Sequence, residues 1–300
     1  MVAVVYNRRY DIGFLGVERF HPFDSRKYGR AWSELKRLFG RELYRHHIAV
    51  DRAVSDEELL LAHSPEYLAR IRHSKNIVAA LEIPVLRHAP GWLLRWTVLG
   101  PMRWAVRGTV LAARAALSGG VAINLAGGYH HAKRDTGEGF CLFSDIAVAV
   151  RQLRAEGLLR TGQRIAYVDL DAHQGNGVCQ QFREDRDVFI FDMYNPAIYP
   201  CYDVEARQRI DCDLRLPIGC RGVEYLAVLR KHLPAFLDSI SQAGSVAQLL
   251  RCRRGHERPD AAFPVRGVDG DRTLPAARSR AATLGRGGAG VRVGRLDRAR

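Results

Sequence analysis

The 300-residue sequence contains no long apolar run, although 47% of its residues are hydrophobic. Because a membrane-spanning helix needs about 20 consecutive apolar residues, we expect neither a transmembrane segment nor a membrane partner. The N-terminus begins Met1-Val2-Ala3-Val4-Val5, without the basic stretch that precedes the apolar part of a secretory signal. The apolar content instead favours a globular domain with a sizeable core.

Regular cysteine spacing is also absent. No two of the six cysteines form a C-x-x-C pair, and their positions fit no disulfide framework: Cys141, Cys179, Cys201, Cys212, Cys220 and Cys252. Disulfide-rich secreted domains and thiolate zinc sites both depend on such spacing. We therefore interpret the cysteines as reduced thiols and predict a cytoplasmic protein.

Lysine is missing from residues 251–300, where thirteen arginines stand against five acidic residues. More than half of the net charge of +14 lies there, so the rest of the chain is only mildly basic. Residues 246–300 show neither helical nor strand periodicity. Three interpretations are open: a disordered basic tail, an arginine-rich nucleic-acid arm, or GC-rich DNA translated in a shifted frame. Arginine without lysine favours the shifted frame, then the tail, so we do not expect nucleic-acid binding.

The first 245 residues alternate between apolar runs and helical patterns. The spacing of apolar residues predicts buried strands at residues 2–6, 121–125, 164–170 and 187–193, and helices at residues 29–38, 55–62, 64–71, 102–117, 144–155 and 222–237. Ser55 with Glu58 forms a capping box, and Ser64-Pro65 marks a second helix start. Such alternation indicates an α/β fold with a mostly parallel sheet flanked by helices.

Two carboxylates and an imidazole follow the strand at residues 164–170, in the order Asp169-Leu170-Asp171-Ala172-His173. Side chains two positions apart along a strand point the same way, so Asp171 and His173 can reach one ion. Their oxygen and nitrogen suit Zn²⁺, with Fe²⁺ nearly as good. Taken alone, the pair is explained better by an N-capping Asp and a structural His than by a metal site.

A tandem pair of imidazoles, His130 and His131, follows the glycine turn Gly127-Gly128 at the end of another predicted strand. Ligands of parallel sheets bind at the carboxyl ends of strands, which is where both motifs fall. Near a metal, one imidazole can accept a proton from water while the other stabilises charge. One buried and one solvated histidine on a turn is the alternative.

Taken together, the motifs closely resemble the zinc-dependent histone deacetylase family over about residues 1–240. The blocks that carry the resemblance read G-G-Y-H-H-A-K from Gly127, G-F-C-L-F-S-D-I from Gly139, and Y-V-D-L-D-A-H-Q-G-N-G from Tyr167. The Q-G-N-G ending is similar to the class IV branch, as are H-P-F-D from His21 and Y-N from Tyr194.

The resemblance implies an arginase/deacetylase-type fold that hydrolyses acyl-lysine amides. It implies that Asp171 and His173 are two of three zinc ligands and that His131 is the general base and later acid. His130 would assist electrostatically with Asp169 behind it, and Asn176 would stand behind His131. The remaining implied positions are tunnel walls at Gly139, Phe140 and Tyr199, and a potassium-site residue at Asp192.

Two elements of the family pattern are missing from the sequence. The third zinc ligand should be an Asp in a G-x-D segment after a later strand, and Gly267-Val268-Asp269 lacks such a strand before it. The oxyanion donor should be a Tyr, but no Tyr follows Tyr225. We therefore predict an incomplete deacetylase-like domain at residues 1–245, with its C-terminal strands missing or replaced, and an aberrant Arg/Gly/Ala-rich tail at 246–300.

Three functions remain open from the sequence. The first is a zinc-dependent lysine deacylase, impaired in this chain, that acts on an acyl-lysine protein or an acylated small amine. The second is a catalytically dead deacetylase-like binding protein, which the missing Tyr and third ligand favour. The third is a nucleic-acid binder, which only the arginine-rich segment supports.

Overall fold

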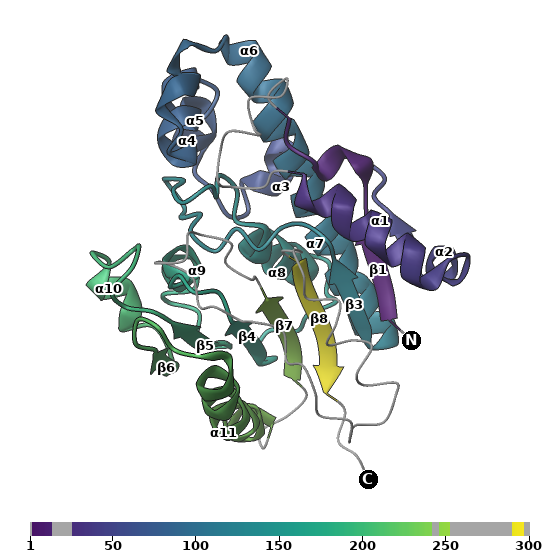
Figure 1. Ribbon diagram of the computed structural model, residues 1–300, viewed down its shortest axis with the longest axis vertical. Coiled ribbons are helices and arrows are strands. Elements are labelled where there is room, and N and C mark those ends of the chain that lie inside the picture. Colours follow the sequence, from purple (N-terminus) through teal and green to yellow (C-terminus); the bar gives the residue numbers. More distant parts are fainter. Residues whose placement is uncertain (1, 14–25, 242–245, 253–289, 297–300) are drawn as a thin grey trace.

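A single eight-stranded sheet forms the centre of the computed structural model, which describes residues 2–13, 26–241, 246–252 and 290–296 (Figure 1). The strand order is β2-β1-β3-β8-β7-β4-β5-β6. Neighbouring strands are parallel except at β8, which is antiparallel to both β3 and β7. The strands are β1 (Val2–Tyr6), β2 (His47–Ala49), β3 (Val121–Asn124), β4 (Ile165–Asp169), β5 (Val188–Tyr194), β6 (Cys212–Arg215), β7 (Val246–Cys252) and β8 (Gly290–Leu296).

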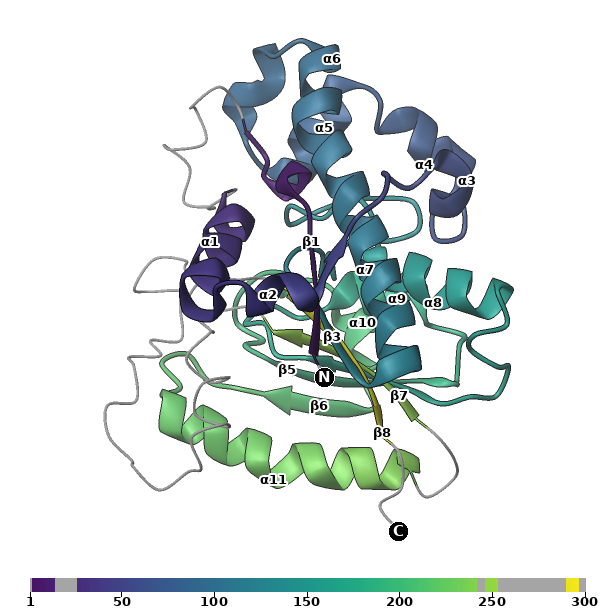
Figure 2. The same ribbon diagram turned by 90° about the vertical axis from the view of Figure 1, so that its right-hand side faces the viewer.

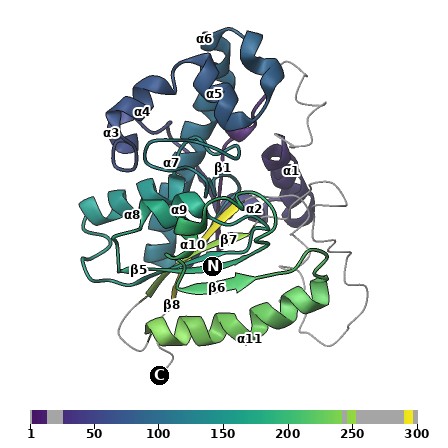
Figure 3. The ribbon, with the colours of Figure 1, turned by 90° about the vertical axis from the view of Figure 1, so that its left-hand side faces the viewer.

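Helices cover both faces of this sheet. Figures 2 and 3 show α11 along one face and α7, α8 and α9 on the other, while α3 to α6 gather at one end of the molecule. The α-helices are α1 (Lys27–Phe39), α2 (Glu42–Arg45), α3 (Asp56–Leu59), α4 (Pro65–Arg70), α5 (Ser74–Leu81), α6 (Gly91–Leu94), α7 (Gly100–Gly119), α8 (Asp145–Ala155), α9 (Asn176–Gln181), α10 (Val204–Arg207) and α11 (Gly222–Ser241). Shorter helical turns are η1 (Arg8–Tyr10), η3 (Pro84–His88) and η4 (Arg95–Leu99).

Alternate residues of β4 contact the two helical layers. Ile165 and Tyr167 belong to the large core beneath α7 and α8, whereas Ala166 and Val168 belong to the smaller core beneath α11. A strand that is buried on both faces needs an apolar residue at nearly every position. This explains why β4 appears in the sequence as a continuous apolar run.

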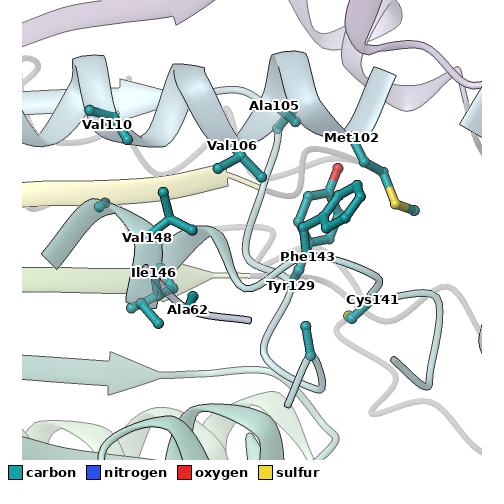
Figure 4. Packing of buried hydrophobic residues seen from close by; sticks show 14 of the residues in the cluster. Ala62, Met102, Ala105, Val106, Val110, Tyr129, Cys141, Phe143, Ile146 and Val148 are labelled. Atoms are coloured by element: carbon teal, nitrogen blue, oxygen red, sulfur yellow. The ribbon is translucent and has the colours of Figure 1, made fainter. Parts of the chain in front are cut away.

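The larger core fills the space between α7 and α8. Figure 4 shows Val106 and Val110 of α7 near Val148 of α8, with the rings of Tyr129 and Phe143 beside the start of α7. All five side chains are buried. The segment that carries the tandem histidines therefore begins in the hydrophobic core, through Tyr129.

Most of the predicted elements are confirmed, and with them the α/β class. All four predicted strands form, with ends within one residue of the predicted ones, and the predicted helices appear as α1, α3, α4, α7, α8 and α11. The helix predicted through residue 62 ends earlier, at Leu59. Its capping box is present: the Glu58 amide donates to Ser55 Oγ at 3.3 Å, and the Ser55 amide donates to Glu58 Oε2 at 2.8 Å.

The sequence predicted that the C-terminal strands are missing or replaced, and the first of these alternatives is wrong at two places. Residues 246–252 form β7, parallel to β4, and residues 290–296 form β8 between β3 and β7. Main-chain hydrogen bonds hold a strand in a sheet, so a sequence without clear strand periodicity can still pair. The rest of the predicted tail lies outside the described residues, and the shifted reading frame stays a prediction.

Candidate active site

The two motifs meet above the sheet although β8 and β7 separate their strands. His130 and His131 lie in the turn after β3, and Asp169 is the last residue of β4. His130 Nδ1 lies 2.7 Å from Asp169 Oδ2, and both side chains are fully buried. The structure thus brings together the two segments whose proximity the sequence predicted.

Asp145, at the start of α8, fixes the glycine turn before the histidines. Its carboxylate accepts from the amides of Gly128 and Tyr129, both at 2.8 Å, and from Thr109 Oγ1 at 2.6 Å. Gly127 has φ +84°, a conformation that favours glycine. A Cβ there would come within 2.3 Å of Asp145 Oδ2. The turn is therefore held by a buried carboxylate that only a glycine backbone can approach.

Asp169 accepts hydrogen bonds at both of its oxygens. Its Oδ2 accepts from Tyr167 Oη and from His130 Nδ1, each at 2.7 Å, and its Oδ1 accepts from the Asp171 amide at 3.1 Å. A carboxylate can only accept, so Nδ1 of His130 carries a proton. Asp169 lies behind His130 as the resemblance implied.

His131 has an amide oxygen, not a carboxylate, behind it. Its Nδ1 lies 2.8 Å from Oδ1 of Asn176, the first residue of α9. Its ring centroid lies 6.0 Å from that of His173 and 5.1 Å from that of Tyr199. His131 therefore stands between the predicted metal ligand and the predicted substrate wall.

Asp171 and His173 converge as predicted. His173 Nδ1 and the His173 amide each lie 2.9 Å from Asp171 Oδ1, and Asp171 is almost completely buried. This oxygen and nitrogen fit one edge of a tetrahedral zinc site in type, and their 2.9 Å separation is that of a hydrogen bond. Within the described ranges, no group of three or more His, Cys, Asp or Glu side chains could hold a metal ion. The pair supplies part of a ligand set.

Gly139 and Tyr199 adjoin His131. A Cβ on Gly139, where φ is +53°, would lie 2.5 Å from His131 Cδ2 and 3.0 Å from Tyr199 Cε1. Burial raises the pKa of Tyr199, so its hydroxyl stays protonated. Phe140 also has positive φ, its amide donates to Ala80 O at 3.0 Å, and its ring packs against the larger core. Gly139 and Tyr199 are thus adjacent, whereas the Phe140 ring packs against the core. Contact of these three residues with substrate stays a prediction.

Asp192 lies on β5 directly opposite Asp169. It is fully buried, and its Oδ2 accepts from the Gly175 amide at 2.8 Å. The Gly175 amide thereby ties the loop between His173 and α9 to β5. A role for Asp192 in a potassium site stays a prediction.

Three charged residues near the site had no predicted role: Lys133, which lies in a motif block, Glu138 and Asp203. All three lie beyond Asn176, on the side away from His131. Lys133 ends one motif block and Glu138 immediately precedes the next, and this position beside the blocks was the available signal. No sequence signal marked Asp203, because its contact with the site depends on how the loop after β5 folds back.

Comparison with known proteins identifies the fold and then the family. A solved structure of a histone deacetylase homologue from Aquifex aeolicus aligns with a TM-score of 0.59 over 79% of this chain and 65% of its own, at 24% identity. A second solved structure, of the HDA15 HD domain, gives 0.64 over 87% of this chain and 76% of its own, at 18% identity. The chain thus has the arginase/deacetylase type of α/β fold.

The histone deacetylase domain model matches residues 21–242, so the chain belongs to this family of deacetylase-type hydrolases. Histone deacetylase 2 of Arabidopsis thaliana is 38% identical over 77% of this chain and 58% of its own length. The chain therefore spans less than two thirds of that curated relative, and the family match ends just before β7 begins.

Proposed function

We propose that this chain is a zinc-dependent lysine deacylase of the class IV-like branch, which hydrolyses the amide bond of acylated lysine side chains. The main support is that the His130–Asp169 and His131–Asn176 pairs lie beside the Asp171–His173 pair, beyond the carboxyl ends of β3 and β4. The letters Q-G-N-G from Gln174 support the class IV-like branch.

Each residue has a chemical role in this proposal. Asp171 and His173 would hold the metal, for which iron is the alternative to zinc. When bound, the metal supplies Lewis acidity that polarises the amide carbonyl. His131 would take a proton from the attacking water and later return it to the leaving amine. His130, paired with Asp169, would stabilise the negative charge that develops on the carbonyl oxygen.

Substrate would enter between Gly139, Phe140 and Tyr199, since two of these contact His131. A narrow passage between these residues would suit a flat acylated amine, either the acyl-lysine side chain of a protein or an acylated small molecule. We place the reaction in the cytoplasm, because Cys141, Cys179, Cys201, Cys212 and Cys220 are free thiols. No helix in the described part of the chain is both long and apolar enough to cross a membrane. Asp192 would bind potassium.

We expect weak turnover from the 300-residue chain expressed by itself. No Tyr follows Tyr225 in the sequence, so the expected oxyanion donor is missing. Removing one such donor typically lowers the rate by about 10²–10³-fold. The same deficit favours the second candidate, a deacetylase-like protein that binds an acyl-lysine or a metal without turnover. The arginines of residues 251–300 alone support nucleic-acid binding, which we do not propose.

Metal content tests the proposal most directly. After dialysis against zinc, the purified chain should contain about one zinc ion per molecule, measured by inductively coupled plasma mass spectrometry. The double variant Asp171→Asn with His173→Ala should contain none. His88→Ala, at an exposed position, is the matched control and should retain zinc. A chain that binds no zinc or iron would refute the proposal.

Peptide turnover distinguishes the two candidates. Acetyl-lysine and long-chain acyl-lysine peptides would be incubated with the zinc-loaded chain. Slow hydrolysis of the acyl group from the lysine side chain that His131→Ala abolishes supports the deacylase, while peptide binding without hydrolysis supports the binding protein. Fast turnover would contradict the expected impairment.

A further inference from the structure

A compact charged cluster lies behind Asn176, on the side away from His131. Asn176 Nδ2 donates to Glu138 Oε1 at 2.6 Å and to Asp203 Oδ2 at 2.9 Å. Lys133 Nζ lies 3.0 Å from the same Glu138 oxygen and 2.9 Å from the same Asp203 oxygen. Two carboxylates and one ammonium thus surround a single amide group. These four contacts join the cluster to Asn176 and not to Asp171 or His173.

The cluster allows only one orientation of the Asn176 amide. An ionised carboxylate accepts hydrogen bonds and cannot donate them. Since Glu138 and Asp203 both face one end of the amide, that end must be the NH₂ group. The carbonyl oxygen must then face His131, 2.8 Å from Nδ1. The chemistry of the neighbours therefore settles an assignment that the shape of an amide alone leaves open.

We propose that Glu138 and Asp203 are positioning residues that act through Asn176 to fix the tautomer of His131. An amide oxygen only accepts, so Nδ1 of His131 must carry the proton, and Nε2 is the nitrogen that acts as base. This inference rests on the proposed function, in which His131 takes a proton from water. It explains how a neutral amide can orient the imidazole as a carboxylate would.

The same cluster explains why residue 176 is Asn and not Asp. A carboxylate at this position would place its second oxygen about where Nδ2 lies, 2.6 and 2.9 Å from two other carboxylate oxygens. One ammonium, Lys133, would then face three negative charges in a site where Asn176 is fully buried. Like charges this close raise the free energy of the folded state or force one group to bind a proton.

The charges of the cluster agree with this arrangement. Burial raises the pKa of Asp203, but hydrogen bonds from Lys133 and Asn176 outweigh it, and the net pKa is lowered. Burial lowers the pKa of Lys133, and the bonds to Asp203 and Glu138 reverse this to a net rise. Tyr202 Oη also donates to Glu138 Oε2 at 2.7 Å, beside the predicted substrate wall. Asp203 and Lys133 thus stay charged, and Glu138 is held at both of its oxygens.

A pair of substitutions tests the cluster without metal or substrate. Asn176→Asp should lower Tm by on the order of 5–10 °C, because it adds an unpaired buried charge. Adding Glu138→Gln should recover at least half of this loss, since the glutamine amide can donate to the new carboxylate. Adding Glu66→Gln, at an exposed position, should recover nothing. An unchanged Tm for Asn176→Asp, or no recovery with Glu138→Gln, would overturn the proposal.

The tautomer itself can be read by ¹⁵N NMR of the imidazoles in the metal-free chain near pH 8, with His131→Ala used for assignment. The native chain should show Nδ1 of His131 protonated. In the double variant Glu138→Gln with Asp203→Asn, both partners can donate or accept, so the second tautomer should appear. A native His131 protonated at Nε2 would refute the proposal. Because this signal needs neither zinc nor turnover, it separates failure of the inference from failure of the proposed function.

Discussion

At the residue scale, His63 shows how a buried imidazole can be structural. Its Nε2 accepts from the Ser144 amide at 2.9 Å, and its Nδ1 donates to Arg134 O at 3.3 Å. The ring is fully buried, and burial lowers its pKa from 6.5 to about 4. His63 is therefore neutral when it ties the start of α8 to the loop after the tandem histidines.

Acidification should weaken the fold through His63. Its pKa is lower folded than unfolded, so the unfolded chain binds the proton first as the pH falls. The contribution of His63 to the free energy of unfolding is complete above pH 6.5 and is lost as the pH falls towards 4. The change is about 3 kcal/mol. Tm measured across this range should fall less steeply for His63→Gln, whose side chain does not titrate.

Exposed His88 supplies the control, because His88→Gln should keep the native slope. Equal slopes for native chain and His63→Gln would show that other groups cause the acid sensitivity.

The sequence predicted the residues with chemical roles, and through the family resemblance also Asp169 and Asn176 behind the histidines, but it missed the more distant residues that position them. Asp171, His173 and the tandem histidines stand at strand ends in a recognisable pattern. Asp145 and Glu138 act through contacts across 17 and 38 positions of the chain. No local pattern encodes which buried amide a distant carboxylate will meet, so only the folded chain reveals these partners.

At the element scale, the start of α9 packs directly on the turn that carries the histidines. A Cβ on Gly177 would lie 2.4 Å from the backbone carbon of His131 and 2.6 Å from His130 O. The Val178 amide donates to His130 O at 3.0 Å. The helix and the turn thus approach as closely as glycine permits.

Gly177→Ala should therefore push the turn away from α9. We expect a loss of about 1–3 kcal/mol, typical of overpacking against a rigid neighbour, measured by denaturant unfolding. Gly100→Ala is the matched control: its added Cβ has only an ordinary contact at 3.7 Å, and alanine is the better helix former. If both variants were equally stable, the close approach would have no energetic role.

Helices and strands were predicted correctly where the apolar pattern extends over many residues. The helices α7 and α11 and the strand β4 have enough apolar positions to show their spacing. The strands β2 and β6 were missed, because each has only three or four residues and lies at an edge of the sheet. An edge strand of that length carries too few side chains to display alternation.

At the scale of the whole molecule, β7 and β8 occupy the middle of the sheet. Their amides should exchange with deuterium orders of magnitude more slowly than those of the loop at residues 157–163, since sheet hydrogen bonds must open first. Mass spectrometry of exchanged peptides measures this. Fast exchange in residues 246–252, with rapid tryptic cleavage after Arg251, would instead support the aberrant tail predicted from composition.

The antiparallel β8 gives the molecule an order of assembly. Among the described elements it is synthesised last, yet it joins β2-β1-β3 to β7-β4-β5-β6. Until it emerges, the nascent chain holds two half-sheets, each with an unpaired edge that can bind another chain. His130 is carried by the first half and Asp169 by the second. The site therefore joins residues from two groups of strands that only β8 connects in the folded sheet.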